Sequence, residues 1–232
     1  MKNKLLFITL LACVSGWGQA TDLFISEYAE GTVGNSKYVE IYNGTGATVN
    51  LSNYVLWRIS NGGNWPEYTY AFTTTNLANG ATLVVANNAT DVPGANEYNI
   101  FCSWNGDDAV GLAKSGVLLD AVGTNGADPG AGWNVAGVTD ATANNKLIRK
   151  SAICSPNTNW ATSAGTDASS SEWEVAAYTT GAAVNGHTAN CNAPTSTTYT
   201  TSWSNGAPTS AIDAIIDGDL TTSTDLACKD LT

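Results

Sequence analysis

The amino-acid sequence predicts an all-β protein whose strands pack as a sandwich, and three features indicate this fold class. Short runs rich in Val, Thr, Tyr and Trp recur along the chain, separated at short intervals by turns rich in Gly and Asn. Several of these runs alternate between residue types, as half-buried strands do. After the amino terminus, helical periodicity never persists for longer than about two turns. Together these features favour strands over helices for most of the chain.

The first two expected strands carry the most specific pattern in the sequence. Residues 24–28 and 38–42 are rich in aromatic and β-branched side chains, and the Gly- and Asn-containing residues 31–36 form the turn between them. Each strand contains one carboxylate, Glu27 in the first and Glu40 in the second. This pairing of charged side chains with apolar strands makes the two glutamates the first candidates for a structural or chemical role.

The faces on which the two glutamates lie follow from counting along each strand. Successive side chains of a strand point to opposite faces, so alternation places Glu27 with Leu23 and Ile25. Glu40 is placed with the aromatic residues of its own strand. Two roles stay open for them: partners of backbone N–H groups or of Arg58, and a carboxylate pair for acid–base chemistry or metal binding.

The later expected strands complete a sandwich. They cover residues 54–60, 68–72, 82–86, a hairpin at 109–122, 146–150 and 172–175. In the strand at 54–60, Val55, Trp57 and Ile59 share one face, and Arg58 lies on the other. Gly116 supplies the positive φ that the tight turn of the hairpin requires. Six or more strands at this spacing fit an immunoglobulin-like β-sandwich.

The chain divides into four expected parts. Residues 1–20 are typical of a secretory signal peptide, with a basic start, an apolar run too short to span a bilayer, and small residues at the cleavage site. Residues 21–175 form the sandwich, residues 176–198 have few large apolar side chains and are expected to be a linker, and residues 199–232 form an incomplete β-rich tail. A second interpretation of the leader has a lipid attached at Cys13, which makes the protein a surface lipoprotein.

The charge balance restricts the kinds of partner. The formal net charge is −11, and removal of Lys2 and Lys4 with the leader leaves seven basic against twenty acidic residues, a net charge of −13. Binding to nucleic acid requires a basic surface, and the single basic group, Lys146, Arg149 and Lys150, is divided between two faces by strand alternation. We therefore expect a protein or polysaccharide partner and no nucleic acid. No segment predicts a membrane span, and the sequence does not indicate an oligomeric state.

An oxygen-rich group lies at the predicted hairpin. It consists of Asn105, Asp107, Asp108 and Asp120. Calcium takes about six to eight oxygen ligands, so a calcium ion is one interpretation, although the Asp-x-Asp-x-Asp-Gly spacing is missing. Capping of turns by Asn and Asp side chains is the other. Apart from this calcium, no cofactor is expected.

Cysteine and tryptophan give two further sets of candidates. The expected mature chain contains four cysteines, Cys102, Cys154, Cys191 and Cys228. In an exported protein an even number suggests disulfides, and three connectivities stay open. Five tryptophans could stack on sugar rings, although at least half are expected in the core: Trp57, Trp65, Trp104, Trp133 and Trp160.

The order of these segments resembles the lamin tail domain family. The similarity covers the Ile-x-Glu strand at 25–27, the Val-Glu-Ile-Tyr-Asn run at 39–43, residues 49–56, residues 77–86, and the hairpin segments 105–112 and 118–123. It extends over roughly residues 22–175 and is closest to the variant found in secreted bacterial proteins, because no heptad-repeat region is present. Trp203-Ser204-Asn205-Gly206 and residues 215–218 resemble segments ahead of the sorting domain in surface proteins of Bacteroidetes.

The resemblance implies an immunoglobulin-like sandwich in which Glu27 and Glu40 belong to the fold and have no catalytic role. It also implies a secreted or cell-surface accessory module for binding or display, as part of a larger exported protein. The alternative from another class is a metal-dependent extracellular hydrolase, nuclease- or phosphatase-like, that uses Glu27, Glu40, Asp107 and Asp108. The hydrolase requires these carboxylates to meet in an open cleft, whereas the accessory module does not.

Overall fold

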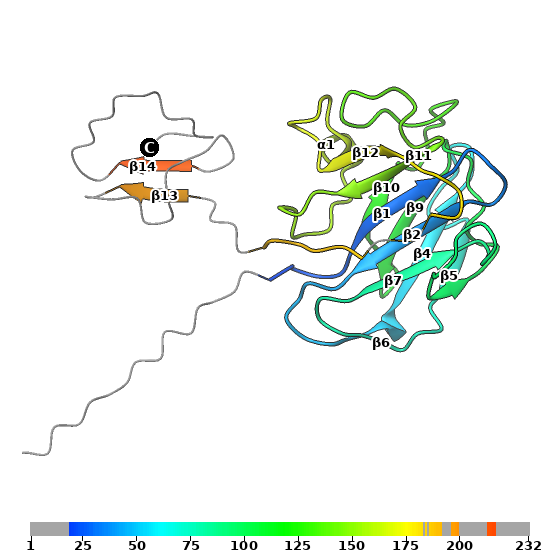
Figure 1. The fold of residues 1–232 in the computed structure, drawn as a ribbon, viewed down its shortest axis with the longest axis horizontal. Coiled ribbons are helices and arrows are strands. Elements are labelled where there is room, and N and C mark those ends of the chain that lie inside the picture. Colours follow the sequence, from blue (N-terminus) through cyan, green and yellow to red (C-terminus); the bar gives the residue numbers. More distant parts are fainter. Residues whose placement is uncertain (1–18, 183, 185, 192–195, 200–212, 217–232) are drawn as a thin grey trace, which may run out of the picture.

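The computed structural model describes residues 19–182, 184, 186–191, 196–199 and 213–216, and its main body is a sandwich of two β-sheets (Figure 1). The larger sheet has the strand order β12–β11–β1–β2–β7–β8. Its strands are β1 (Phe24–Glu30), β2 (Lys37–Tyr42), β7 (Thr82–Ala86), β8 (Glu97–Tyr98), β11 (Asn145–Arg149) and β12 (Trp173–Ala177). Neighbours are antiparallel except for β7 and β8, which are parallel.

The second sheet is antiparallel and has the order β10–β9–β4–β5. Its strands are β4 (Tyr54–Ile59), β5 (Tyr68–Ala71), β9 (Ala109–Lys114) and β10 (Val117–Val122). The remaining elements are short: β3 (Val49–Asn50) with β6 (Asn76–Leu77), the 3₁₀ turn η1 (Leu51–Asn53), and the helix α1 (Trp160–Ala164). The predicted all-β sandwich is therefore confirmed.

The main hydrophobic core lies between the two sheets. Alternate residues of the strands point into it, among them Ile25, Tyr28, Val39, Ile41, Leu56, Val110 and Leu112. Each of these side chains is completely buried, and burying one aliphatic side chain of this size stabilises the fold by ~1.5–3 kcal/mol. Because Leu56 points inward, its neighbours Trp57 and Ile59 lie on the outer face of the smaller sheet. As predicted, Trp57 and Arg58 lie on opposite faces of the sheet. Arg58 lies on the inner face, together with Leu56.

Part of the outer face of the six-stranded sheet is covered by residues 178–182, 184 and 186–191, which we name the strap. Tyr178 is buried and packs against Tyr38 of β2 with ring centroids 5.5 Å apart. Further along, His187 packs edge-on against Tyr42, with centroids 5.0 Å apart, and against Phe24 of β1. Burial lowers the pKa of His187 to about 4, and the charge of Arg149 adds to this effect.

Part of the segment 176–198, which we expected to be a linker, is packed on the sheet as the strap. Its few apolar side chains are sparse in the sequence, but they fall over apolar side chains on the outer face of the sheet, so they pack in spite of their small number. A disulfide between Cys154 and Cys191 joins the end of the strap to the loop after β11. The packed body therefore extends to Cys191, and the division of the rest of the chain stays a prediction.

We expect the strap to resist limited proteolysis while this disulfide is intact. In the Cys191→Ser variant the end of the strap loses its covalent attachment, and the remaining contacts at Tyr178 and His187 hold it only locally. Mass spectrometry of the fragments should then show cleavage within residues 178–191 in the variant alone. Equal cleavage of the oxidised wild type would show that the strap does not dock as described.

Several expected segments lie outside the described residues. These are residues 1–18 with Cys13, the segment around Trp203, and Cys228. In the tail, β13 (Ser196–Tyr199) and β14 (Asp213–Ile216) pair in parallel. Within the described ranges, no helix has the length and apolar character needed to cross a membrane.

Candidate functional site

A β-bulge in β1 determines where the first glutamate points. Ile25 lies opposite Ile41 and Glu27 opposite Glu40, so the register gains one residue, Ser26, between the two pairs. An extra residue in one strand shifts every following side chain to the other face. Glu27 therefore lies on the outer face together with Glu40, and the face predicted by strict alternation is wrong.

The two glutamates form a buried polar cluster beneath the strap. Glu27 accepts a hydrogen bond from the hydroxyl of Tyr38 at 2.5 Å and pairs with Lys146 Nζ at 3.3 Å. Glu40 Oε1 accepts a hydrogen bond from Ser26 Oγ at 2.7 Å, while its Oε2 is buried without a hydrogen-bond partner in the described part of the protein. Lys146, and not Arg58 as proposed from the sequence, is the cation beside Glu27.

The surroundings of these carboxylates change their acidity. Burial raises the pKa of Glu40 to about 8; the hydrogen bond from Ser26 opposes this effect, and the charge of Glu27 adds to it. Burial also raises the pKa of Glu27, against the hydrogen bond from Tyr38 and the charge of Lys146. Two carboxylates directly opposite each other destabilise a strand pair when both are charged, so a proton on Glu40 relieves the repulsion.

The carboxylates expected for a hydrolase are not assembled into one site. Glu27 and Glu40 are at most 3% exposed and lie on the outer face of the larger sheet, whereas Asp107 and Asp108 precede β9 of the other sheet. Among the described residues, no three His, Cys, Asp or Glu side chains are grouped so that they could hold a metal ion. The combined carboxylate site that the sequence suggested is therefore absent from this part of the chain.

Two of the four oxygen-bearing residues near the hairpin, Asp108 and Asp120, are paired with different cations of the protein. Asp108 accepts a hydrogen bond from the N–H of Asn61 at 3.1 Å and lies 3.9 Å from Arg58. Asp120 is fully buried and forms an ion pair with Arg149. Asp120 is thereby committed to a cation of the protein, and calcium binding by Asn105 and Asp107 stays a prediction.

The structure shows the pairing state of three of the four candidate cysteines. Cys154 and Cys191 form the disulfide described above. Cys102 is a free, completely buried thiol whose Sγ lies 3.4 Å from the carbonyl oxygen of Val85. Burial raises the pKa of this thiol well above its usual value, and the nearby Arg58 charge opposes the increase. The prediction that Cys102 belongs to a disulfide is wrong, because the interior of the sandwich encloses it.

Trp104 and Trp160 belong to the main core, and Trp160, which is 6% exposed, also reaches a pocket beside the half-buried Trp133. Trp104 is completely buried and its indole N–H donates to the carbonyl oxygen of Ala29 at 2.9 Å. Trp57 is 8% exposed on the outer face of the smaller sheet and lies against Trp65, with ring centroids 6.4 Å apart. These three are accounted for by packing.

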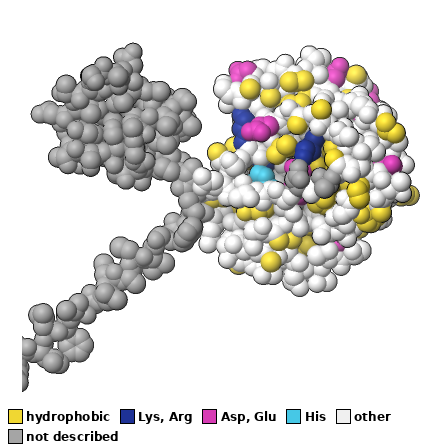
Figure 2. All heavy atoms as spheres, viewed as in Figure 1, with side chains coloured by type: hydrophobic (Ala, Val, Ile, Leu, Met, Phe, Trp, Pro, Cys, Tyr) yellow, Lys and Arg dark blue, Asp and Glu magenta, His cyan; other side chains and the backbone are white. Residues whose placement is uncertain are grey.

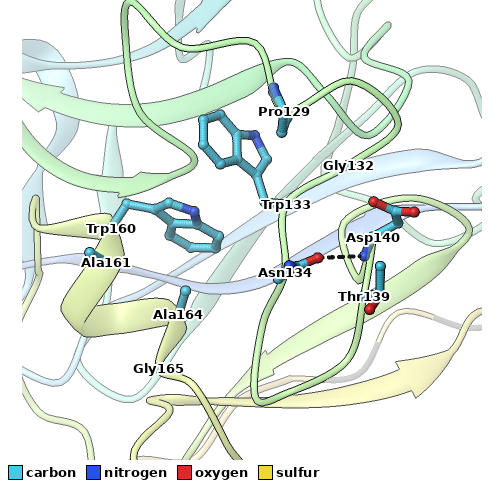
Figure 3. A pocket seen from close by; sticks show the side chains of 10 residues that line it. All are labelled: Pro129, Gly132, Trp133, Asn134, Thr139, Asp140, Trp160, Ala161, Ala164 and Gly165. Carbon is cyan, nitrogen blue, oxygen red and sulfur yellow. Dashed lines mark hydrogen bonds between the residues drawn. The ribbon is translucent and has the colours of Figure 1, made fainter.

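Trp133 and Trp160 line an open pocket of about 460 Å³ (Figure 3). Their rings are nearly perpendicular, at 81°, with centroids 6.3 Å apart. Figure 3 shows Trp160 and Ala164 on one side of the pocket, with Asn134, Thr139 and Asp140 toward the other. Pro129, Gly132, Ala161 and Gly165 complete the lining. The pocket thus offers an aromatic wall opposite a polar one, an arrangement suited to a ligand with one apolar face and several hydrogen-bonding groups.

The long connection from β10 to β11 is held in place by hydrogen bonds to the sandwich. Thr142 Oγ1 donates to the carbonyl oxygen of Gly106 at 2.6 Å and accepts the N–H of Trp133 at 2.7 Å. The N–H of Ala136 donates to the carbonyl oxygen of Ala164 at the end of α1, at 2.9 Å. Val135 is completely buried in the main core. The pocket is therefore built on a fixed loop and a short helix.

Sequence reasoning identified the two tryptophans of this pocket and missed its polar side. Asn134 and Asp140 are six positions apart, and the side chain of Asn134 accepts the N–H of Asp140 at 3.0 Å. Asp140 has a φ of 51°, which Asn and Asp adopt more readily than most residues.

The comparison with known families bears on the first part of the sandwich. No curated protein and no solved structure matches the chain. One family model matches residues 18–126, a little under half of the chain, and this part runs from β1 to the end of β10. All residues of the pocket lie after it. The matching family is the Lamin Tail Domain, so residues 18–126, with both glutamate strands and the hairpin, are similar to that family.

Proposed function

We propose that the protein is a secreted, non-catalytic binding module of the lamin tail type, and that it holds a polysaccharide in the pocket beside Trp133 and Trp160. The observation that carries this proposal is the pocket itself, in which an aromatic wall faces polar side chains. Aromatic rings contribute large apolar contact area at little cost in conformational entropy. A pyranose ring presents apolar C–H groups on its face and hydroxyl groups at its edge, which matches the two walls.

The charge of the protein supports a glycan in preference to nucleic acid. The net charge of the full chain is −11, and neutralising phosphates would require a cluster of cations. In the view of Figure 2, the Lys and Arg side chains form small, separate groups with acidic side chains close by. A neutral glycan meets no electrostatic penalty at such a surface, so stacking and hydrogen bonds decide its binding.

The proposal predicts that Trp133→Ala weakens polysaccharide binding by about tenfold or more, because truncation of a central aromatic contact commonly costs at least about 1.4 kcal/mol. Wild type and variant should be compared by depletion binding to insoluble polysaccharides and by calorimetry with soluble oligosaccharides. Trp65→Ala is the matched control, because Trp65 is also partly exposed but lies outside the pocket. Equal losses in both variants, or salt-sensitive binding to duplex DNA by the wild type, would contradict the proposal.

A further inference from the structure

We propose that the pocket selects an amino sugar with a free ammonium group, of the glucosamine type, and that Asp140 is the residue that determines this preference. The inference rests on the proposed function, because it names the class of sugar that binds at the same pocket. The ring of the sugar would stack against Trp133, and its ammonium group would donate to the carboxylate of Asp140.

Asp140 is a fixed and unused carboxylate at the pocket. Its N–H donates to Asn134 Oδ1 at 3.0 Å, and its carbonyl oxygen accepts the N–H of Ala143 at 2.9 Å. These backbone contacts hold the residue in place, whereas its carboxylate oxygens accept no hydrogen bond from the described residues. Gly132 permits the close approach, since a Cβ at that position would lie 3.2 Å from the Asp140 backbone.

The charge at the pocket favours a cationic ligand. Among the ten lining residues labelled in Figure 3, Asp140 is the only charged one, so the lining offers no cation to neutralise it. A hydrogen bond between an ammonium group and a carboxylate is roughly twice as strong as one between neutral groups. The acidic surface of the whole protein acts in the same direction and repels uronic acids and sulfated sugars.

The shape of the pocket favours a sugar over a simple organic cation. Trp133 and Trp160 contact each other edge to face, so they do not surround a cation as the walls of an aromatic cage do. The polar side chains of Asn134 and Thr139 lie beside Asp140. A lysine side chain would engage only the carboxylate, whereas a sugar ring places several hydroxyl groups near these residues.

The test compares three soluble tetrasaccharides on the full mature chain by calorimetry: a glucosamine oligomer, an N-acetylglucosamine oligomer and cellotetraose. The buffer is mildly acidic, so that the amine of glucosamine is protonated. We expect the glucosamine oligomer to bind about tenfold more tightly than cellotetraose, and added salt to reduce this difference. Asp140→Asn should remove the preference for the glucosamine oligomer over cellotetraose, because the amide offers the ammonium group no charge. Asp128→Asn is the matched control, because Asp128 lies in the same loop outside the pocket lining.

The outcomes separate this inference from the proposed function. Binding of all three oligomers with equal affinity, unaffected by Asp140→Asn, would overturn the inference while the pocket remained a glycan site. Failure of the wild type to bind any of them, or any insoluble polysaccharide, would overturn the proposed function and the inference with it. Binding of a lysine-rich peptide that depends on Asp140, without binding of sugars, would assign the pocket to a cationic protein segment and would also overturn the inference.

Discussion

Asp120→Ala is expected to lower the free energy of unfolding by about 3–5 kcal/mol, because it leaves a buried cation without its partner. Arg149 has a fully buried side chain that donates to both carboxylate oxygens of Asp120, one of them at 2.7 Å, and also to Glu172. Its guanidinium lies 4.1 Å from the ring centroid of Trp173. Since a domain of this size is typically stable by only about 5–15 kcal/mol, the variant should unfold at much lower urea concentration.

This ion pair also holds the backbone of Ile25, directly before the bulge that orients Glu27. Asp120 accepts the N–H of Ile25 at 2.8 Å, and Arg149 Nε donates to the carbonyl oxygen of Ile25 at 3.1 Å. The pair thus joins β10 of the smaller sheet to β1 and β11 of the larger one. Loss of Asp120 leaves the N–H of Ile25 without this acceptor, and loss of Arg149 leaves its carbonyl oxygen without this donor, which adds to the cost in each case.

A matched control uses the ion pair between Lys114 and Asp22, in which Lys114 is 44% exposed. Exposed pairs contribute about 0–1 kcal/mol, so Lys114→Met should move the urea midpoint far less than Asp120→Ala. The double variant Asp120→Leu with Arg149→Met removes both charges and should recover the part of the loss that comes from the unpaired charge, but not the part from the hydrogen bonds to Ile25. A cost below about 1 kcal/mol for Asp120→Ala would contradict the role assigned to the pair.

Glu40→Gln is expected to stabilise the protein at alkaline pH and to remove the part of the pH dependence of stability that comes from Glu40. The pKa of Glu40 in the folded protein is about 8, against an ordinary value of 4.5. The folded state therefore holds a proton that the unfolded chain releases, so stability is lost as the pH rises from about 4.5 to about 8. Each tenfold change in proton affinity between the two states corresponds to about 1.4 kcal/mol, so the expected gain above pH 8 is a few kcal/mol.

The comparison should measure urea unfolding between acid and alkaline pH. Glutamine preserves an acceptor for Ser26 and cannot ionise, so wild type and Glu40→Gln should have similar stability at the acid end and should diverge toward the alkaline end. Glu174→Gln, at an exposed position of β12, is the control for the loss of one carboxylate and should follow the wild-type profile. Parallel profiles for wild type and Glu40→Gln would show that Glu40 is not held protonated.

The parts of the fold that the sequence predicted are those determined by local patterns. Alternation and turn residues located β1, β2, β4 and the β9–β10 hairpin, because their side-chain periodicity is visible within each segment. The bulge at Ser26 escaped prediction, since one inserted residue changes the face without changing composition. The Asp120–Arg149 pair, which hydrogen-bonds to Ile25 beside the bulge, joins positions 29 residues apart.

The strap and the pocket also depend on contacts that local sequence patterns do not predict. Tyr178 and His187 are isolated in a sequence of small residues, and only the aromatic surface beneath them explains why they pack. Trp133 and Trp160 were recognisable as aromatic candidates, but their meeting depends on how the β10–β11 connection folds over α1. Asp140 is placed beside them by contacts with Gly132 and Asn134 within the folded loop, and no periodic pattern in the sequence predicts that loop conformation.

Binding of a sugar in the pocket beside Trp133 and Trp160 can be observed directly by nuclear magnetic resonance of the indole N–H groups. The ¹⁵N-labelled protein would be titrated with the glucosamine tetrasaccharide, after assignment of the signals with single Trp→Phe variants. We expect saturable changes in the positions of the Trp133 and Trp160 signals, whereas those of Trp57, Trp65 and Trp104 stay in place. Changes confined to Trp57 and Trp65, or no change of any indole signal at saturating sugar, would contradict binding in this pocket.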